Sequence, residues 1–498
     1  LFADYSQPNQ DGFAHWLAER GMDKSLAVPN PDVRKHPGSD LYLPGHDGQW
    51  AAAYNQYYSD LTADTIGYFA RIVKEETEGR CLAGTFYGYV IQLAGEPRQT
   101  LAAHASLRKV LDDPNVDFLG GIPLHNYRRL DGYSAFVSAT ESILAAGKLY
   151  VNENDLFSWL HPWHWNTEYN PKDPRRGVVF MHRREIANQA VHGAVGQWFS
   201  LQTSWHHDKA LQADFARQIR LQAQSLRYDR SSVAEIAFMV DDTTFSWTPP
   251  ESVLPGLCNV QLLYSLAKTG TPVDVWLLSD LDRLPERIRF IVIANAAAAY
   301  PRDIAKLEAL VRQGGKTIVA VGAPGLVDPT NGAWRSERPA EVLGLPIRVD
   351  DAALPGNIAL NESGAPVASF GASPRPRARV EGEGFLKYPD GACAGTERPL
   401  HTGGRLIWCG MPPLSVSLLR GWLERAGVHC YAPPECFVYA ARELVSITSP
   451  IEGDVNIEWP RDVHVEDLFD GWRGSGRSIR CPFELGQTRL FHVKPRMP

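Results

Sequence analysis

Apolar and polar residues are arranged along residues 80–205 in a pattern that predicts four strands separated by helices. Short apolar runs that predict buried strands occur in "RCLAGTFYGYVIQLAG", "VDFLGGIPLHNY", "GKLYVNENDLFSW" and "AVGQWFSLQ". Segments with helical apolar spacing lie between them, at 104–113, at about 136–146 and in "HRREIANQAVHG". Strands that alternate with helices predict a parallel sheet with right-handed crossovers. Two further helical patterns precede this region, at residues 10–20 and 49–78.

Polar and aromatic side chains gather where each predicted strand ends. In chain order these residues are Tyr87 and Tyr89, His125 and Asn126, Glu153, Asn154 and Asp155, and the segment 202–207. Trp198 and Trp205 flank the last predicted strand. A barrel assembles its active site from several strands at one rim, whereas an open doubly wound sheet concentrates its chemistry at a single switch point. Four polar strand ends therefore favour part of a (β/α)8 TIM barrel within residues 1–230.

The pattern changes after residue 230. Residues 231–430 predict a second parallel α/β domain with a flavodoxin-like alternation of buried strands and helices. Within it, residues 325–404 are rich in Pro, Gly and Ala and are interpreted as an insertion. Residues 431–498 alternate in short runs, which predicts a small antiparallel β domain.

Composition narrows the classes of function. The 498 residues predict two to four domains, and 44% apolar with 21% charged residues is typical of a globular protein. A net charge of −7 gives no electrostatic reason to expect a nucleic-acid partner, and no apolar run approaches membrane-spanning length. The seven cysteines form no C-x-x-C pair, which favours a reducing, cytoplasmic location. No phosphate-binding glycine motif occurs, so we expect no cofactor. The lack of a C-x-x-C pair, and of a third ligand beside His161 and His164, leads us to expect no metal.

Glu153 is the strongest candidate for chemistry. A carboxylate at a barrel strand end can attack an anomeric carbon or hold a water molecule that does so. Asn152 and Asn154 could hold the Glu153 pKa low by hydrogen bonding, and Asp155 could orient Glu153 or bind a hydroxyl. The same sequence also fits an exposed loop glutamate followed by an aspartate that caps a turn.

The aromatic and histidine candidates each have a second interpretation. Tyr87 and Tyr89 could contact substrate or pack in the core, and His125 could bind substrate or simply end a strand. One of Trp198 and Trp205 could stack on a sugar face.

The order of the predicted domains resembles the three-domain β-galactosidases of glycoside hydrolase family 42. "PNQDGFAHWLAERG" resembles the family's helix after barrel strand four, and "LAGTFYGYV", "VDFLGGIPLHNY", "KLYVNENDLFSW" and "AVGQWFSLQTSW" resemble strands five to eight. The resemblance implies a retaining β-glycosidase with Glu153 as its nucleophile. It also implies that residues 231–430, a flavodoxin- or amidotransferase-like domain, assemble a homotrimer.

The same resemblance places the acid/base residue at the end of strand four, upstream of Leu1. The first residues, "LFADYSQPNQ", contain no initiator Met and no signal-peptide pattern, so we expect the sequence to be a fragment of a longer protein.

Two other functions stay open. One is a carbohydrate-binding or assembly protein whose barrel has lost its acid/base residue. The other is an amidotransferase-type enzyme acting through residues 231–430, against which the lack of a Cys, His and Glu triad counts.

Overall fold

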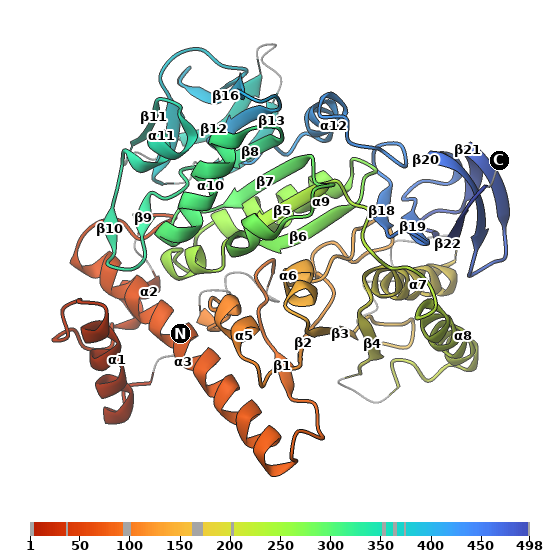
Figure 1. Cartoon of the computed structure of the whole chain (residues 1–498), viewed down its shortest axis with the longest axis horizontal. Helices are drawn as coiled ribbons and strands as arrows, with labels where there is room; N and C mark the ends of the chain where they lie inside the picture. The colour runs from red at the N-terminus through yellow and green to blue at the C-terminus, as the bar shows by residue number, and fades with distance from the viewer. Residues whose placement is uncertain are drawn as a thin grey trace.

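The computed structural model describes residues 4–35, 38–92, 101–161, 173–200, 204–350, 355–361, 366–372 and 375–496. Its larger sheets are a four-stranded sheet, a central sheet and a C-terminal five-stranded sheet. In Figure 1 the four-stranded sheet lies below the central sheet, and the C-terminal sheet lies to its right. In these residues, no helix combines the length and the apolar character that crossing a bilayer requires.

The first sheet is parallel and runs in chain order. Its strands are β1 (Gly84–Phe86), β2 (Phe118–Gly121), β3 (Leu149–Asn154) and β4 (Val195–Trp198). The helices that follow these strands are α5 (Leu107–Asp112), α6 (Thr140–Ala145), α7 (Pro174–His192) and α8 (Lys209–Ser225). This confirms the prediction of four parallel strands separated by helices.

The two faces of this sheet differ sharply. Tyr150 points toward the helices and is fully buried. Phe86, Leu149 and Val195 lie on the opposite, inner face and remain 43%, 44% and 48% exposed. The Phe86 ring lies over Gly120, where a Cβ would come within 3.1 Å of the ring carbons. The inner face is therefore apolar but accessible to solvent.

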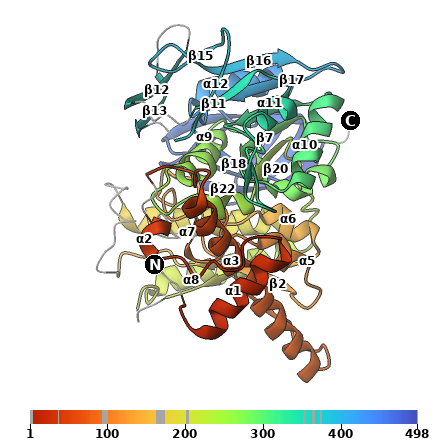
Figure 2. The ribbon, with the colours of Figure 1, turned by 90° about the vertical axis from the view of Figure 1, so that its left-hand side faces the viewer.

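Three helices precede the first sheet. They are α1 (Gln7–Glu19), α2 (Pro31–Lys35) and α3 (His46–Glu76). Trp16 of α1 donates its indole N–H to Asp60 of α3 at 3.0 Å, and Ser106, just before α5, donates its hydroxyl to the same carboxylate at 2.7 Å. Asp60 thus connects α1 to the first sheet's helices, and Figure 2 shows α1 and α3 on the near side of the molecule.

The parallel part of the central sheet has the strand order β6-β5-β7-β8-β17. Its strands are β5 (Ile236–Val240), β6 (Val273–Leu277), β7 (Phe290–Asn295), β8 (Thr317–Val321) and β17 (Arg405–Cys409). The helices of this region are η1 (Thr243–Trp247), η2 (Gly256–Gln261), α9 (Leu262–Ala267), η3 (Leu278–Arg283), α10 (Pro301–Gln313) and α12 (Val416–Arg425). This order is that of flavodoxin-like sheets.

Residues 325–404 extend the central sheet and add a small hairpin to it. They contain α11 (Arg338–Leu343), β9 (Val327–Asp328), β10 (Ala333–Trp334), β11 (Ile347–Asp350), β12 (Pro355–Asn361), β13 (Pro366–Ala372), β14 (Arg377–Val380), β15 (Leu386–Lys387) and β16 (Cys393–Pro399). The strand β16 pairs antiparallel with β17, so the segment interpreted as an insertion continues the sheet.

The carboxyl edge of β5 and β7, where flavodoxin-like folds bind their ligands, is packed against α3. Asn55 of α3 donates to the carbonyl oxygen of Ser246 in η1 at 3.2 Å, and Gln56 donates to the hydroxyl of Tyr300 at 2.5 Å. Asp241 and Asp242, which follow β5, are buried at this edge. In the described residues, α3 and two buried carboxylates therefore occupy the carboxyl end of β5.

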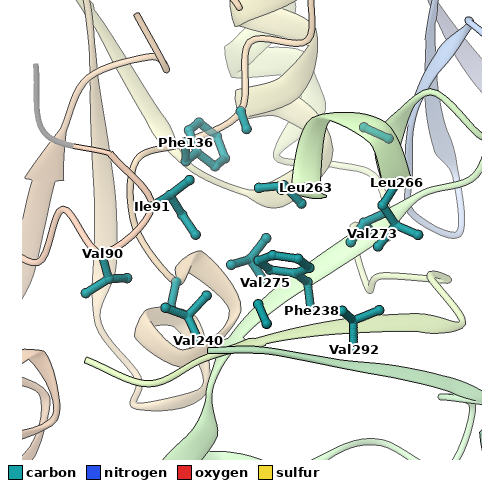
Figure 3. Close-up of a cluster of buried hydrophobic side chains, with 14 of the residues drawn as sticks. Val90, Ile91, Phe136, Phe238, Val240, Leu263, Leu266, Val273, Val275 and Val292 are labelled. Atoms are coloured by element: carbon teal, nitrogen blue, oxygen red, sulfur yellow. The ribbon is translucent and has the colours of Figure 1, made fainter. Parts of the chain in front are cut away.

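One apolar core joins the first sheet to the central sheet. Figure 3 shows Val90 and Ile91, which follow β1, facing Phe238 and Val275 of the central sheet, with Leu263 of α9 beside them. Burial of side chains of this size contributes on the order of 2 kcal/mol each. The two sheets are consequently held by shared burial and not by a flexible connection.

Side chains of α6 cover the exposed edge of the central sheet. The strand β6 is the last strand on this side. Glu141 accepts a hydrogen bond from the Val275 backbone N–H at 2.7 Å, and Ser142 accepts one from Leu277 at 2.8 Å. Edge N–H groups are prone to pair with other chains, so α6 protects this strand.

The C-terminal sheet is antiparallel, as predicted, with the order β18-β19-β22-β20-β21. Its strands are β18 (Phe437–Ala440), β19 (Leu444–Thr448), β20 (Gly453–Asp467), β21 (Arg473–Phe483) and β22 (Thr488–Pro495). The helix α7 packs against it. The Tyr439 hydroxyl of β18 donates to the carbonyl oxygen of Ser134 at 3.1 Å, which links this sheet to the loop before α6.

Replacing Glu141 tests the protection of the β6 edge. Glu141→Ala leaves the Val275 N–H without an acceptor and should cost about 1–3 kcal/mol of unfolding free energy. Glu141→Gln keeps an oxygen acceptor and should cost less. The midpoint of thermal unfolding of the two variants at one pH measures the difference.

The pH dependence gives a second readout of the same pair of variants. Burial raises the Glu141 pKa from 4.5 to about 7. The stability that Glu141 contributes is therefore present below pH 4.5 and is lost as pH rises through 7. The Gln variant lacks this loss, so its unfolding temperature should improve relative to the native chain as pH rises. An unchanged difference across this window would contradict the assignment.

Candidate active site

Glu153 lies on the inner face of the first sheet, near the carboxyl end of β3. Its register partner is Gln197 of β4, whose side-chain amide donates to Glu153 Oε2 at 3.4 Å. The apolar row of Phe86, Val151 and Val195 lies one step below on the same face. Glu153 therefore sits on an apolar floor at the edge to which all four parallel strands point.

Asp155 is held by two cationic or polar partners from the loop after β2. Arg128 Nη1 lies 2.6 Å from Asp155 Oδ1, and His125 Nε2 lies 3.2 Å from Oδ2. Burial by itself would raise the Asp155 pKa, but Arg128 and His125 outweigh burial, and the pKa lies below its usual value. Asp155 is accordingly ionised at neutral pH.

The pKa of Glu153 is shifted in the opposite direction. Burial raises it first, the charge of Asp155 raises it further, and the hydrogen bond from Gln197 opposes both. The expectation that its surroundings lower this pKa is therefore wrong. The two neighbouring carboxylates have environments that separate their pKa values, a pattern found at catalytic sites.

Asn152 and Asn154 cannot stabilise the Glu153 carboxylate, because alternate residues of a strand point to opposite faces. Both side chains are fully buried on the helix side of β3. Asn152 donates to Asn154 Oδ1 at 3.1 Å, and Gln189 of α7 donates to the same oxygen at 2.7 Å. The two asparagines join the sheet to α7 and do not face Glu153.

Tyr89 lies close to both carboxylates, while Tyr87 belongs to the core. Burial raises the Tyr89 pKa, and the charges of Glu153 and Asp155 raise it further. The ring of His104 stacks on Tyr87 at 4.9 Å and lies 4.7 Å from Tyr89, and its Nδ1 accepts the Tyr89 backbone N–H at 3.1 Å. Burial lowers the His104 pKa to about 4, so this ring is neutral. His104 thus positions Tyr89 at the site.

The two tryptophans occupy different places. Trp198 follows Gln197 on β4 and therefore points to the helix side, where it stacks on Phe215 of α8 at 4.5 Å. Trp205 is buried and meets the ring of Phe157 edge-on at 4.5 Å. Trp198 therefore lies on the opposite face of the sheet from Glu153. Trp205 packs in a cluster of rings with Phe157 and His161. Of the segment 202–207, residues 202 and 203 lie outside the described residues.

Two residues that contact the candidate carboxylates were not predicted from the sequence. Arg128 follows His125 by three residues in the same strand-end loop, which is a signal that could have been used. Gln197 is identified only by the register between β3 and β4. The predicted residue Asn126 is an exposed member of this loop, and its backbone N–H donates to Gln92 Oε1 at 3.4 Å.

Arg184 of α7 supports the loop that carries Arg128 and His125. Its side chain is 1% exposed and donates to the backbone oxygens of Arg128 and Gly132 at 2.7 Å and of Arg129 at 2.5 Å. Buried carbonyl groups need such donors, because water cannot reach them. The position of Asp155 therefore depends on α7 through Arg184 and Arg128.

Within the described residues, no group of three or more His, Cys, Asp or Glu side chains could hold a metal ion. The chemistry that the site offers is that of carboxylates: one with a raised pKa and one that stays ionised.

Comparison with known proteins relates this fold to a glycosidase family. No family model matches the chain, and no curated protein matches it. A β-galactosidase from Bacillus circulans sp. alkalophilus matches with a TM-score of 0.68 at 14% identity over 99% of this chain and 77% of that chain. A catalytic mutant of Gan42B, a GH42 β-galactosidase from G. stearothermophilus, matches with a TM-score of 0.64 at 14% identity over 99% and 77%. A β-galactosidase from the haloarchaeon Halorubrum lacusprofundi matches with a TM-score of 0.61 at 16% identity, over 98% of this chain and 76% of that chain. The chain has the fold of GH42 β-galactosidases.

Replacing Arg184 tests the support of the site loop. Arg184→Met leaves the carbonyl groups of Arg128 and Gly132 without donors, whereas that of Arg129 keeps the Gly132 backbone N–H at 3.0 Å. The variant should destabilise the chain by several kcal/mol. Arg176→Met on the same helix removes a half-exposed ion pair with Glu484 and should cost at most about 1 kcal/mol.

Hydrogen exchange locates the effect of these variants. Peptides that span residues 125–135 should exchange faster in Arg184→Met and at the native rate in Arg176→Met. Equal exchange in the two variants would show that Arg184 does not hold this loop.

Proposed function

We propose that the chain carries the nucleophile of a retaining β-glycosidase of the β-galactosidase type, and that Glu153 is that nucleophile. The observation that carries the proposal is the position of Glu153 on the inner face of a parallel sheet, beside Gln197, Asp155 and Tyr89 at its carboxyl edge. The fold shared with proteins named as β-galactosidases supports this choice of reaction.

In this reaction a Glu153 oxygen attacks the anomeric carbon of the substrate, and the bond to the leaving group breaks as the glycosyl–enzyme ester forms. Water then cleaves the ester and releases the sugar with its configuration retained. The attacking carboxyl group must be ionised, so the reaction depends on pH through the raised Glu153 pKa.

Asp155 is a poor candidate for the acid/base residue. A general acid must carry a proton at the working pH, whereas Arg128 and His125 keep the Asp155 pKa low. Retaining enzymes also place their two carboxyl groups about 5–5.5 Å apart across the substrate. We therefore propose that the acid/base residue lies on strands that face the inner side of this sheet.

The apolar inner face supports the same conclusion. Phe86, Leu149 and Val195 are 43%, 44% and 48% exposed, which is unusual for three large apolar side chains on one face of a sheet. Further β/α units packed on this face would bury these side chains and close a (β/α)8 barrel in which β1 to β4 are strands five to eight. Such a barrel would hold its interior side chains in layers below Glu153.

Other expectations stay predictions. They are the domain boundaries at residues 230 and 430, a homotrimer formed through residues 231–430, and a cytoplasmic location. A carbohydrate-binding protein without catalysis is the alternative that the following experiment separates from an enzyme.

Covalent trapping tests the role of Glu153 in the longest natural chain that contains this sequence. A 2-deoxy-2-fluoro β-galactoside with a dinitrophenyl leaving group needs no acid for its departure, so it should label Glu153 with one fluorosugar. Mass spectrometry of the digested protein identifies the labelled peptide. Glu153→Gln should not be labelled, and its turnover of aryl β-galactosides should fall by several orders of magnitude.

The matched control is Glu75→Gln, which alters an exposed glutamate of α3 and should label and turn over normally. Azide should partly restore Glu153→Ala and yield a glycosyl azide of inverted configuration. Normal turnover by Glu153→Gln would show that Glu153 is not the nucleophile. Sugar binding without labelling in the native protein would favour the carbohydrate-binding alternative.

Asp155→Asn tests the electrostatic coupling of the two carboxylates. Activity should be lost as pH falls through the Glu153 pKa, because protonation removes the nucleophile. The charge of Asp155 raises that pKa, so its removal should move the acidic limb of kcat/KM to lower pH. His125→Gln, which leaves the Asp155 charge in place, serves as the control. A limb that moves to higher pH in Asp155→Asn would contradict the coupling.

A further inference from the structure

A cavity of about 660 Å³ lies where the amino-terminal ends of β5 and β6 meet the C-terminal sheet. Glu235 and Arg287 contribute to its wall from the segments that precede β5 and β7, and Trp459 and Arg461 contribute from β20. The residues around Glu153 do not line it. Its volume is within the range of roughly 300–1,000 Å³ typical of small-molecule sites, which often form between domains.

A bulge in β20 builds one wall of this cavity. Glu458 pairs with Ser478 and Val463 pairs with Gly476, so the four residues 459–462 oppose a single residue of β21. Bulges of this kind redirect side chains and are frequent beside binding sites. Trp459 and Arg461 both belong to this bulge and both line the cavity.

Aromatic rings form part of the same wall. Trp459 and Tyr431 meet edge-on with their ring centroids 6.0 Å apart, and Tyr431 meets His429 edge-on at 4.6 Å. Trp459 is 1% exposed, and its indole N–H has no hydrogen-bond partner among the described residues. This nitrogen is itself closed to solvent, so a ligand in the cavity would meet the edge of the aromatic wall and not the indole N–H.

The charges around the cavity leave an excess of donors. Glu235 is neutralised by Arg289 at 2.8 Å and also accepts the His429 backbone N–H at 2.7 Å. Arg287 pairs with Asp274 at 2.5 Å, while its Nε is buried without an acceptor in the described part of the chain. Arg461 forms no ion pair or hydrogen bond with any described residue. The acidic group of the wall is thus occupied, and the three arginines of the wall, Arg287, Arg442 and Arg461, outnumber it.

We propose that this cavity is a binding site for a small monocarboxylate that carries a six-membered ring, a sugar acid or an aromatic acid. The carboxylate would accept hydrogen bonds from Arg461, and the ring would lie against the aromatic and aliphatic wall. This site is independent of the reaction proposed for Glu153, because none of the residues that surround Glu153 line the cavity.

Calorimetric titration of the full chain with D-galacturonate, benzoate and neutral D-galactose tests the site. At least one of the two acids should bind, and Arg461→Gln should weaken its binding by about 10- to 100-fold. Arg461 is exposed, so this variant should fold normally. Arg480→Gln, an exposed arginine of β21 outside the cavity wall, should leave binding unchanged. Higher salt should weaken the binding.

The outcomes separate the possible ligands. Binding of galacturonate without benzoate identifies a sugar acid, and the reverse identifies an aromatic acid. The proposal fails if neither acid binds at concentrations up to about 10 mM, if Arg461→Gln binds as tightly as Arg480→Gln, or if Glu153→Gln abolishes the binding.

Discussion

The buried guanidinium of Arg184 is the interaction on which the geometry of the candidate active site depends. It joins α7 to the loop after β2 through three backbone carbonyl groups, and Arg128 of that loop holds Asp155 beside Glu153. Moving the loop would leave buried acceptors unpaired, at a cost comparable to a substantial part of a domain's stability. The spacing of the two carboxylates is therefore determined by a helix that packs between two sheets.

The candidate active site is supported by apolar side chains that the three larger sheets bury together. A single apolar core contains side chains from the segment after β1, from β5 and β6 of the central sheet, and from β18 of the C-terminal sheet. The helix α3 covers the carboxyl edge of the central sheet, where flavodoxin-like folds place their ligands. The central sheet consequently supports the first sheet, whose carboxyl edge carries Glu153.

Buried carboxylates occur both beside β6 and at the candidate active site, and their partners decide the direction of the pKa shift. Glu141 and Asp274 lie together beside β6, and burial raises the pKa of each to about 7, although Arg287 pairs with Asp274. Asp155 is also largely buried, but Arg128 and His125 lower its pKa. Glu141 stabilises the β6 edge in its protonated form, whereas Asp155 keeps a negative charge beside Glu153 and raises the Glu153 pKa.

The sequence by itself determined the order of strands and helices and the edge at which the candidate site lies. Apolar runs ending in polar residues identify parallel strands and their carboxyl ends, which is why Glu153, Asp155, His125 and Tyr89 could be predicted to lie together. Only the tertiary structure decided to which face of the sheet each side chain points. A shift of one residue in the register of a strand moves every side chain of that strand to the opposite face. Trp198, Asn152 and Asn154 were assigned to the site for this reason and lie on the helix side. The Glu153 pKa and the cavity at the β20 bulge depend on burial and pairing between segments far apart in the sequence, which no local pattern encodes.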